Sequence, residues 1–264
     1  MDIIIKTLLV CFILMNGYIN NVNAQKQTQI KVMSYNLRFG ELASLEELAE
    51  FIKKENPDIV ALQEVDVKTY RERAQHQNGK NFISELAFRT GMLSLYGKTI
   101  PYMGGYYGIG ILTKYPYISA KRILLPMPEG SKEQRAYLVS DIELPDGNIF
   151  TFVSTHLDYP TSEVRLAQVD SLNSDLLKHK NPIVLCGDFN AKPDSYEISV
   201  CMSEWKQVSN MNFTSPAKNA KSKIDYIFCY PHSKWQIISA ETPVIQLSDH
   251  LPVIATLELL ENQD

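Results

Sequence analysis

The sequence predicts an α/β protein whose strands form mixed β-sheets. Short apolar runs alternate with segments of helical periodicity along most of the chain. Two apolar runs, over residues 138–144 and 149–155, flank the segment Pro145-Asp146-Gly147-Asn148. An Asp-Gly turn in this position is typical of an antiparallel hairpin. Strands joined by hairpins as well as by helices indicate mixed sheets rather than one purely parallel sheet.

The first half of the chain is predicted to contain two helices and three strands. One helix begins after Ser44, because Ser44 and Glu47 have the spacing of a capping box, and it stops at Asn56-Pro57-Asp58. A second helix covers residues 82–89 and ends at Gly91. The expected strands lie at residues 30–35, 59–62 and 109–113.

The second half repeats this pattern after the hairpin. A helix is expected over residues 162–178, with its inward face formed by Val164, Ala167, Leu172 and Leu176. Further strands are expected at residues 182–186, 224–229 and 251–257. No linker rich in Pro, Ser or Gly interrupts the chain, so residues 25–264 are predicted to form a single domain.

The composition is that of an ordinary globular protein. The chain has 264 residues, of which 45% are hydrophobic, and its formal net charge of -4 provides no broad basic surface for nucleic acid. A local cation or a bound metal ion would still neutralise a phosphate. The net charge therefore does not exclude nucleic acid as a substrate.

The first 24 residues resemble a cleaved secretory signal peptide. Lys6 precedes an apolar run over residues 7–15 that is too short to span a bilayer, and Val22-Asn23-Ala24 places small side chains before Gln25. We therefore expect a secreted or periplasmic protein without a stable membrane anchor. A short amphiphilic anchor is the competing interpretation. No obligate protein partner is evident from the sequence.

Three cysteines remain after that cleavage. Cys186 and Cys229 lie in apolar runs, where a buried thiol behaves as a small hydrophobic group. Their spacing does not suggest zinc. One disulfide, for instance with Cys201, is compatible with an exported protein, and the sequence leaves this open.

Polar side chains recur where the predicted strands begin or end. The most informative is the segment Gly187-Asp188-Phe189-Asn190, which directly follows an apolar run. Asp188 and Asn190 are two residues apart, so on an extended backbone they would point the same way. A simple turn is the alternative interpretation. Six other such positions are Asn36, Glu64, His156, Asp158, Asp225 and Asp249-His250.

Taken in order, these segments resemble the motifs of the endonuclease/exonuclease/phosphatase superfamily, which has the fold of pancreatic deoxyribonuclease and neutral sphingomyelinases. The resemblance extends from about residue 30 to residue 257. It is carried by Ser34-Tyr35-Asn36, Leu62-Gln63-Glu64-Val65-Asp66, Gly110-Ile111-Leu112-Thr113-Lys114-Tyr115-Pro116, Ser154-Thr155-His156-Leu157-Asp158, Gly187-Asp188-Phe189-Asn190, Ile224-Asp225-Tyr226-Ile227 and Ser248-Asp249-His250.

The resemblance implies a four-layer sandwich, with two mixed β-sheets packed face to face and helices outside. It also implies a secreted bacterial metal-dependent hydrolase of phosphate esters, with Mg²⁺ as cofactor and Mn²⁺ as the alternative. The substrate would be a nucleic acid, a phospholipid head group or a small phosphodiester. Val65-Asp66 after Glu64, together with His156, resembles the deoxyribonuclease, sphingomyelinase and lipid-phosphatase branch rather than the abasic-site endonucleases.

The same resemblance assigns roles to individual residues. Glu64, Asn36 and Asp249 are the expected metal ligands. His250 is the expected general base, held in one tautomer by Asp225, and Asp188 would orient or activate the attacking water. Whether His250 or Asp188 removes the proton stays open at this stage. His156 would donate a proton to the phosphate or to the leaving group, and Asn190 would hold a phosphoryl oxygen.

Several weaker candidates complete the prediction. Tyr107, in a glycine-rich stretch with Tyr106, and Arg71, which is close to Arg73, are candidate contacts for the substrate phosphate; loop packing and solvated arginines are the alternatives. A basic cluster of Lys218, Lys221 and Lys223 is expected to be a solvated loop.

A phosphodiesterase is the favoured function. The alternatives are a nuclease, a phosphomonoesterase acting on inositol-phosphate-like substrates, and a non-catalytic binding module. A serine hydrolase is excluded, since the chain lacks a Gly-x-Ser-x-Gly segment.

Overall fold

The computed structural model describes residues 28–260, which contain two six-stranded mixed β-sheets. The predicted signal peptide lies outside the described residues. The first sheet has the order β11 (Trp235–Glu241), β12 (Val253–Leu259), β1 (Gln29–Asn36), β2 (Ile59–Val67), β4 (Gly105–Thr113) and β3 (Leu93–Tyr102). The second has the order β5 (Tyr117–Leu124), β6 (Ala136–Glu143), β7 (Ile149–His156), β8 (Ile183–Asp188), β10 (Asp225–Tyr230) and β9 (Lys206–Gln207).

Each sheet contains one parallel pair of strands among antiparallel ones. β1 runs parallel to β2, and β7 runs parallel to β8. A parallel pair needs a crossover connection, and the helices α2 (Leu45–Glu55) and α4 (Ser162–Leu176) supply one for each sheet. The predicted hairpin is confirmed, because β6 and β7 pair in antiparallel fashion on either side of the Asp-Gly turn.

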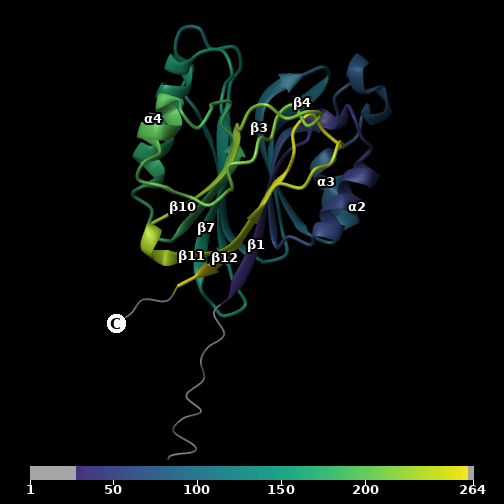
Figure 1. The fold of residues 1–264 in the computed structure, drawn as a ribbon. Coiled ribbons are helices and arrows are strands. Elements are labelled where there is room, and N and C mark those ends of the chain that lie inside the picture. Colours follow the sequence, from purple (N-terminus) through teal and green to yellow (C-terminus); the bar gives the residue numbers. More distant parts are fainter. Residues whose placement is uncertain (1–27, 261–264) are drawn as a thin grey trace, which may run out of the picture.

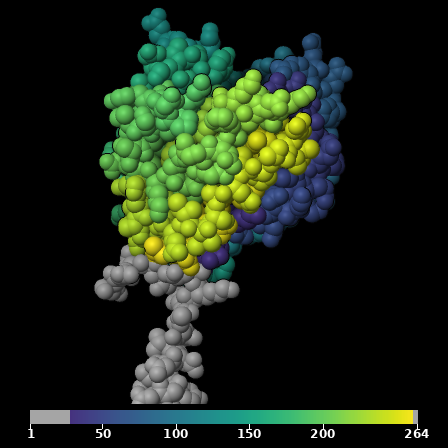
Figure 2. Space-filling model, viewed as in Figure 1, coloured from purple at the N-terminus to yellow at the C-terminus, as the bar shows by residue number. Residues whose placement is uncertain are grey.

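The sheets pack face to face, and the helices cover their outer surfaces. The central core joins Val32 and Ile111 of the first sheet to Phe152 and Val184 of the second, all of them buried. α2 and α3 (Phe82–Thr90) pack on the first sheet, whereas α4 packs on the second (Figure 1). This confirms the predicted four-layer sandwich. In the space-filling view, the C-terminal part of the described chain crosses one face between the two halves (Figure 2).

The predicted helix boundaries follow from their caps. Ser44 and Glu47 form the reciprocal capping box of α2, and Asn56 ends that helix in the left-handed conformation. Gly91 ends α3 in the same way, with φ of 72°. α4 ends at Leu176, two residues earlier than expected. Four further short helices are η1 (Arg38–Gly40), η2 (Glu72–Gln77), the π-helical turn η3 (Glu197–Cys201) and η4 (His232–Lys234).

The structure corrects several details of the sequence prediction. Ala167 is only half-buried, and Gln168 and Val169 occupy the inward face of α4 instead. Tyr106 and Tyr107 lie in strand β4, not in a loop. The strands β3, β5, β9 and β11 have no clear period-two apolar pattern, and β5 is exposed along nearly its whole length, so sequence reasoning missed them.

The structure contains no disulfide among the described cysteines, and it buries one lysine of the predicted solvated cluster. Cys186, Cys201 and Cys229 are all free, and the first and last are buried as predicted. Lys223 is fully buried rather than solvated, and its Nζ has no hydrogen-bond partner among the described residues. Among residues 28–260 no helix is both long enough and apolar enough to cross a membrane.

Candidate active site

Three adjacent strands of the second sheet present three polar residues side by side. His156 at the end of β7 is in register with Asp188 at the end of β8. Asp188 is in turn in register with Asp225, the first residue of the antiparallel strand β10. All three residues are buried. Strand register therefore places these residues, which are far apart in sequence, in one row.

The first sheet contributes Asn36 and Glu64 to the same place. Asn36 ends β1, and its Nδ2 donates to Glu64 Oε1 at 3.2 Å and to Asp188 Oδ2 at 3.1 Å. Glu64 lies where the pairing of β2 with β4 shifts register, and its φ of 56° is unusual for a residue with a side chain. Such bulges turn a side chain away from the regular pleat and are common beside active sites. This local strain lets Glu64 face the cavity.

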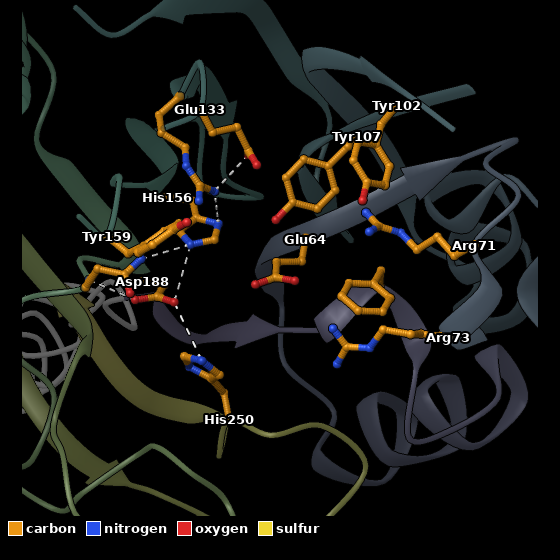
Figure 3. A pocket seen from close by; sticks show the side chains of 13 residues that line it. Glu64, Arg71, Arg73, Tyr102, Tyr107, Glu133, His156, Tyr159, Asp188 and His250 are labelled. Carbon is orange, nitrogen blue, oxygen red and sulfur yellow. Dashed lines mark hydrogen bonds and ion pairs between the residues drawn. The ribbon is translucent and has the colours of Figure 1, made fainter. Parts of the chain in front are cut away.

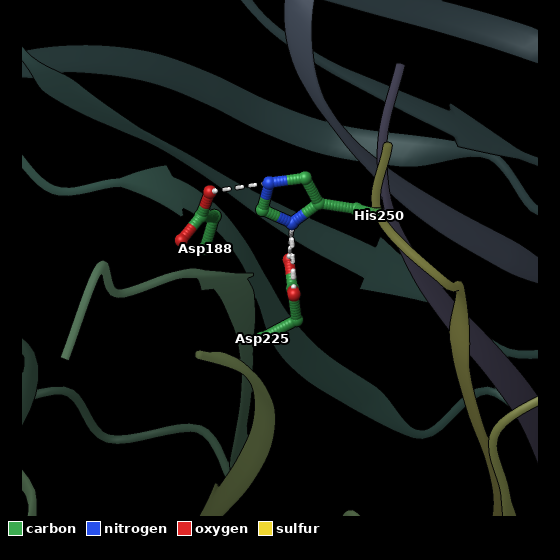
Figure 4. A group of neighbouring side chains, drawn as sticks. All are labelled: Asp188, Asp225 and His250. Atoms are coloured by element: carbon green, nitrogen blue, oxygen red, sulfur yellow. Dashed lines mark hydrogen bonds and ion pairs between the residues drawn. The ribbon is translucent and has the colours of Figure 1, made fainter. Parts of the chain in front are cut away.

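His250 lies between the two aspartates (Figure 4). Its Nδ1 is 2.9 Å from Asp225 Oδ2, so Nδ1 carries a hydrogen and donates it to that carboxylate. Nε2 faces Asp188 Oδ2 at 3.7 Å. Ser248 secures this loop, because its Oγ donates to the carbonyl oxygen of Asn36 at 2.7 Å. The expected contact between His250 and Asp225 is therefore present.

Electrostatics set the protonation of this pair. Burial disfavours the charged imidazole, but the carboxylates of Asp225 and Asp188 outweigh it and raise the pKa of His250 to about 9. Burial, reinforced by the charge of Asp225, raises the pKa of Asp188 to about 7. Asp188 consequently takes up and releases protons near neutral pH.

His156 has the opposite environment. Arg135 Nη1 donates to its Nδ1 at 2.8 Å, and Arg135 is itself buried. Burial, with the charge of Arg135 as the next cause, lowers the pKa of His156 well below its usual value. His156 is therefore neutral, and its hydrogen is on Nε2, which lies 3.5 Å from Asp188 Oδ2.

Sequence reasoning missed Arg135. The predicted hairpin could have located this arginine, because β6 and β7 pair in a register that puts Ala136 opposite His156. The residue before Ala136 therefore has to lie near the catalytic candidates. Glu133, from the same segment, approaches Arg135 Nη1 at 3.3 Å and was missed as well.

A cavity of about 390 Å³ joins these groups to solvent (Figure 3). His156, Asp188 and His250 lie on one side of it, and Arg71, Arg73 and Tyr102 lie on the other, with Glu64 between them. The cavity is lined by Phe39, Glu64, Arg71, Arg73, Tyr102, Tyr107, Glu133, Arg135, His156, Tyr159, Asp188, Asn190 and His250.

The weaker candidates Tyr107 and Arg71 both line this cavity. Arg71 is not a solvated loop arginine, because its side chain is only 12% exposed and forms an ion pair with the buried Asp66. Tyr107 is buried in strand β4, and burial raises the pKa of its hydroxyl well above the usual value. The Tyr107 hydroxyl is therefore a hydrogen-bond donor at neutral pH.

Asn190 does not share an extended backbone with Asp188, and Asp249 does not line the cavity. The strand ends at Asp188, and Asn190 adopts φ of 49°, so the two do not lie on one extended backbone. Asn190 still reaches the cavity, with its Nδ2 3.2 Å from His156 Nε2. Asp249 forms an ion pair with Arg38 and is not among the residues that line the cavity.

The donor atoms present fit a hard divalent cation. Nδ2 of Asn36 donates to the carboxylates of both Glu64 and Asp188, and carboxylate oxygens of this kind suit Mg²⁺ or Mn²⁺. Oδ1 of Asn36 accepts from the backbone N–H of Arg38. Ligand atoms of Asp188, Asp225 and His250 also lie within 4.8 Å of one another. Since His250 Nδ1 already donates to Asp225, the oxygen set beside Glu64 is the better fit for such an ion.

The fold and the site together define a sandwich protein with a polar cavity at the ends of its strands. The sequence profile of the Endonuclease/Exonuclease/phosphatase family matches residues 33–250, and the chain belongs to this family. Its cavity residues Glu64, His156, Asp188 and His250 come from the segments on which the resemblance was noted.

Solved structures of low sequence identity share the fold. An endonuclease/exonuclease/phosphatase from Bacteroides vulgatus is 20% identical, with a TM-score of 0.73 over 89% of this chain and 100% of that one. A mannosyl-6-phosphatase of Bacteroides thetaiotaomicron is 17% identical, with a TM-score of 0.68 over 86% and 99% of the two chains. The human Nocturnin catalytic domain, with bound sulfate, is 21% identical, with a TM-score of 0.66 over 88% and 95%.

Proposed function

We propose that the protein hydrolyses phosphate esters with the help of a divalent cation, and that phosphodiesters are its preferred substrates. The observation that carries this proposal is the pair of histidines on either side of Asp188. His250 is held by a carboxylate, and His156 is kept neutral by an arginine. His250 in its neutral form is suited to accept a proton, and His156 is suited to donate a hydrogen bond.

Glu64 and Asp188 would hold Mg²⁺, or Mn²⁺ as the alternative. Asn36 would join them once its amide turns so that Oδ1, which accepts from the backbone N–H of Arg38, faces the ion. When bound, the cation would neutralise negative charge on the phosphoryl oxygens and stabilise the leaving alkoxide. The sequence also assigned Asp249 to this role. Its ion pair with Arg38 would have to open before Asp249 could reach a cation.

Hydrolysis forms one bond from a water oxygen to phosphorus and breaks the bond from phosphorus to the ester oxygen. Asp188 would orient the water. Nε2 of His250 would accept its proton in the molecules in which His250 is neutral, a fraction that grows as pH rises toward about 9, and Asp225 would stabilise the resulting imidazolium. Nε2–H of His156 would donate to a phosphoryl oxygen or to the leaving oxygen. Tyr107 and Asn190 would contact the remaining phosphoryl oxygens from the wall of the cavity.

A phosphomonoesterase is the second candidate function. Arg71, Arg73 and Arg135 all line the cavity, and three guanidinium groups offer directed N–H donors to an ester with several charged oxygens. The mannosyl-6-phosphatase that shares the fold is named for a reaction of this kind. A nuclease is a third alternative, and it differs in substrate but not in the chemistry proposed for these residues.

A substrate panel with and without chelator tests the proposal. It would compare an aryl phosphodiester, an aryl phosphomonoester, DNA, RNA, sphingomyelin and phosphoinositides in the presence of Mg²⁺ or Mn²⁺. We expect hydrolysis of at least the aryl phosphodiester, and loss of that hydrolysis when the cation is removed. Turnover that persists in excess chelator, or the absence of turnover on every ester, would contradict the proposal.

Variants of the two histidine environments sharpen this test. We expect His250→Ala to lower turnover by about 10²–10⁴-fold, which is the usual loss on removing a general base. His232→Ala is the matched control, because His232 is exposed in η4 and does not line the cavity. Near-normal turnover in folded His250→Ala would show that Asp188, or another group, takes the proton.

A further inference from the structure

Two arginines form an ordered wall opposite the catalytic candidates. The guanidinium carbon of Arg71 lies 4.0 Å from the ring centre of Phe39 and 4.2 Å from that of Tyr102. The guanidinium carbon of Arg73 lies 5.4 Å from the same Phe39 ring. The two rings hold the guanidinium group of Arg71 in a fixed plane, whereas Arg73, whose side chain is 61% exposed, is positioned mainly by its ion pair with Glu41. The steps proposed for hydrolysis give these two arginines no contact with the reacting phosphorus or the attacking water.

Both arginines use the same edge to bind a carboxylate behind them. Arg71 donates from Nε and Nη2 to Asp66, and Arg73 donates from Nε and Nη2 to Glu41. In each case Nη1 takes no part in the ion pair. Figure 3 shows both guanidinium groups on the cavity side of their side chains. The carboxylates thus fix each arginine so that its remaining donors face the cavity.

A smaller hollow extends the cavity at this wall. Its volume is about 150 Å³, and it shares Phe39, Arg71, Arg73 and Tyr102 with the main cavity. Glu72 and Met103 complete its lining. The arginines therefore lie between the space beside Glu64 and a second space large enough for a small group of the substrate.

We infer that Arg71 and Arg73 form a second anion-binding subsite, so that the preferred substrate carries another negatively charged group next to the ester that is cleaved. This inference rests on the proposed function and specifies its substrate class: a phosphate ester with a phosphate or carboxylate a few bonds from the reacting phosphorus. The cleaved phosphate lies beside Glu64 and the histidines, and the second anion lies against the arginine wall.

Recognition at this subsite depends on directed donors rather than on excess positive charge. Asp66 and Glu41 neutralise the two arginines, and Glu72 adds a negative charge at the edge of the smaller hollow. A phosphate or carboxylate would meet directed N–H groups, whereas a neutral group would leave them without a partner. The expected selectivity is therefore for an anion at a defined distance from the reacting phosphorus.

Three chromogenic diesters with one leaving group test the inference. Each joins 4-nitrophenyl phosphate to a three-carbon chain, which ends in a hydroxyl, a phosphate or a carboxylate. We expect the phosphate-ended ester to have a kcat/KM higher than the hydroxyl-ended ester by about 10-fold or more, since charge-assisted hydrogen bonds are the strong ones. The carboxylate-ended ester shows whether the second anion has to be a phosphate. Equal kcat/KM for all three esters would overturn the subsite.

The arginine variants identify the wall as the source of the preference. Arg73→Gln is expected to lower the ratio of kcat/KM for the phosphate-ended over the hydroxyl-ended ester several-fold. A double variant, Arg71→Gln with Asp66→Asn, removes the second arginine without leaving the charge of Asp66 buried and unpaired. In this variant the same kcat/KM ratio should fall close to one. Arg89→Gln is the matched control, because Arg89 also pairs with glutamates but lies on α3, away from the cavity. An equal loss of preference in the control would overturn the inference.

A binding measurement separates this inference from the proposed function. Metal-free protein would be titrated calorimetrically with propane-1,3-diol bisphosphate and with the corresponding monophosphate. Tighter binding of the bisphosphate, lost in Arg73→Gln, supports the subsite even if no ester is hydrolysed. Equal binding of the two compounds would overturn the subsite while leaving the hydrolysis assay as a separate test.

Discussion

The two cavity histidines differ because their Nδ1 atoms face opposite charges. Nδ1 of His250 meets the carboxylate of Asp225, whereas Nδ1 of His156 meets the guanidinium of Arg135. A carboxylate favours the imidazolium and a guanidinium opposes it, so the same type of side chain acquires two protonation states within one cavity. Residue identity alone therefore does not assign acid and base roles here.

Lys223 shows the same dependence on surroundings outside the cavity. Its ammonium is buried beside the ring of Tyr226, with Nζ 5.2 Å from the ring centre. Burial lowers its pKa from 10.5 to about 8, and the neighbouring Asp225 opposes that shift only partly. A charged group without a hydrogen-bond partner in such a place costs stability.

We predict that Lys223→Met stabilises the protein at pH 7. The folded-state pKa of Lys223 lies below the unfolded value, so folding releases its proton between about pH 8 and pH 10.5. The wild type therefore gains stability as pH rises through this window, on the order of 3 kcal/mol. The variant lacks this gain, and its advantage should be greatest below pH 8.

Urea unfolding at several pH values measures this effect. Lys221→Met is the control, since Lys221 is exposed two residues away. If both variants give the same pH dependence as the wild type, the buried ammonium does not have the energetic cost inferred for it.

At the scale of the secondary-structure element, register determines which residues meet. The pairing of β7 with β8 and of β8 with β10 puts His156, Asp188 and Asp225 in one row. In β2, the shifted register at Glu64 turns that side chain into the cavity. A change of register by one residue would reverse the faces of these side chains and remove the site.

Gly187 allows β7 and β8 to approach each other closely, because it has no side chain. A Cβ atom added to Gly187 would lie 2.3 Å from the carbonyl oxygen of Thr155, its partner in β7. We predict that Gly187→Ala lowers the free energy of unfolding by about 1–3 kcal/mol, because the clash is with backbone and forces β7 and β8 apart. It should also impair phosphate-ester turnover, since His156 and Asp188 are the next residues in both strands.

Chemical denaturation and the diester assay measure these two effects. Gly97→Ala provides the comparison, because there the nearest atom is a side-chain carbon of Ile109 at 3.1 Å and can move aside. A Gly187→Ala protein as stable and as active as the wild type would show that the two strands separate at little cost.

At the scale of the whole molecule, the sandwich brings the ends of strands from two sheets together. Asn36 from the first sheet donates to Asp188 from the second, so the cavity exists only when the sheets are packed against each other. The arginine wall comes from the first half of the chain, and the histidines come from the second. Packing and function are therefore coupled through the same contacts.

We predict that the mature protein is exported and begins at Gln25. β1 begins at Gln29, so cleavage after Ala24 leaves every described strand intact. Mass spectrometry of protein recovered outside the cytoplasm of an expressing bacterium would give the N-terminus. Ala24→Leu should slow processing, because the cleavage site requires a small side chain there. Retention of unprocessed wild-type chain in the cytoplasm would contradict this prediction.

Local sequence patterns predicted most of the secondary structure and many residues of the candidate site. Apolar runs, the capping box at Ser44 and the Asp-Gly hairpin predicted elements that the structure confirms. Polar residues at strand ends identified Glu64, His156 and His250, because each sits at a boundary that local patterns reveal. Edge strands such as β5 were missed, since an exposed strand has no apolar alternation.

Contacts between distant side chains follow from the packing of the two sheets and could not be predicted from local patterns. Arg135 beside His156, Arg71 between aromatic rings, Asp249 paired with Arg38 and the buried Lys223 all depend on contacts between segments far apart in the chain. Periodicity shows which face of a strand is buried, but it does not show what lies against that face. The protonation of a buried side chain depends on those neighbours, so the chemistry of the cavity follows from packing and not from the motifs alone.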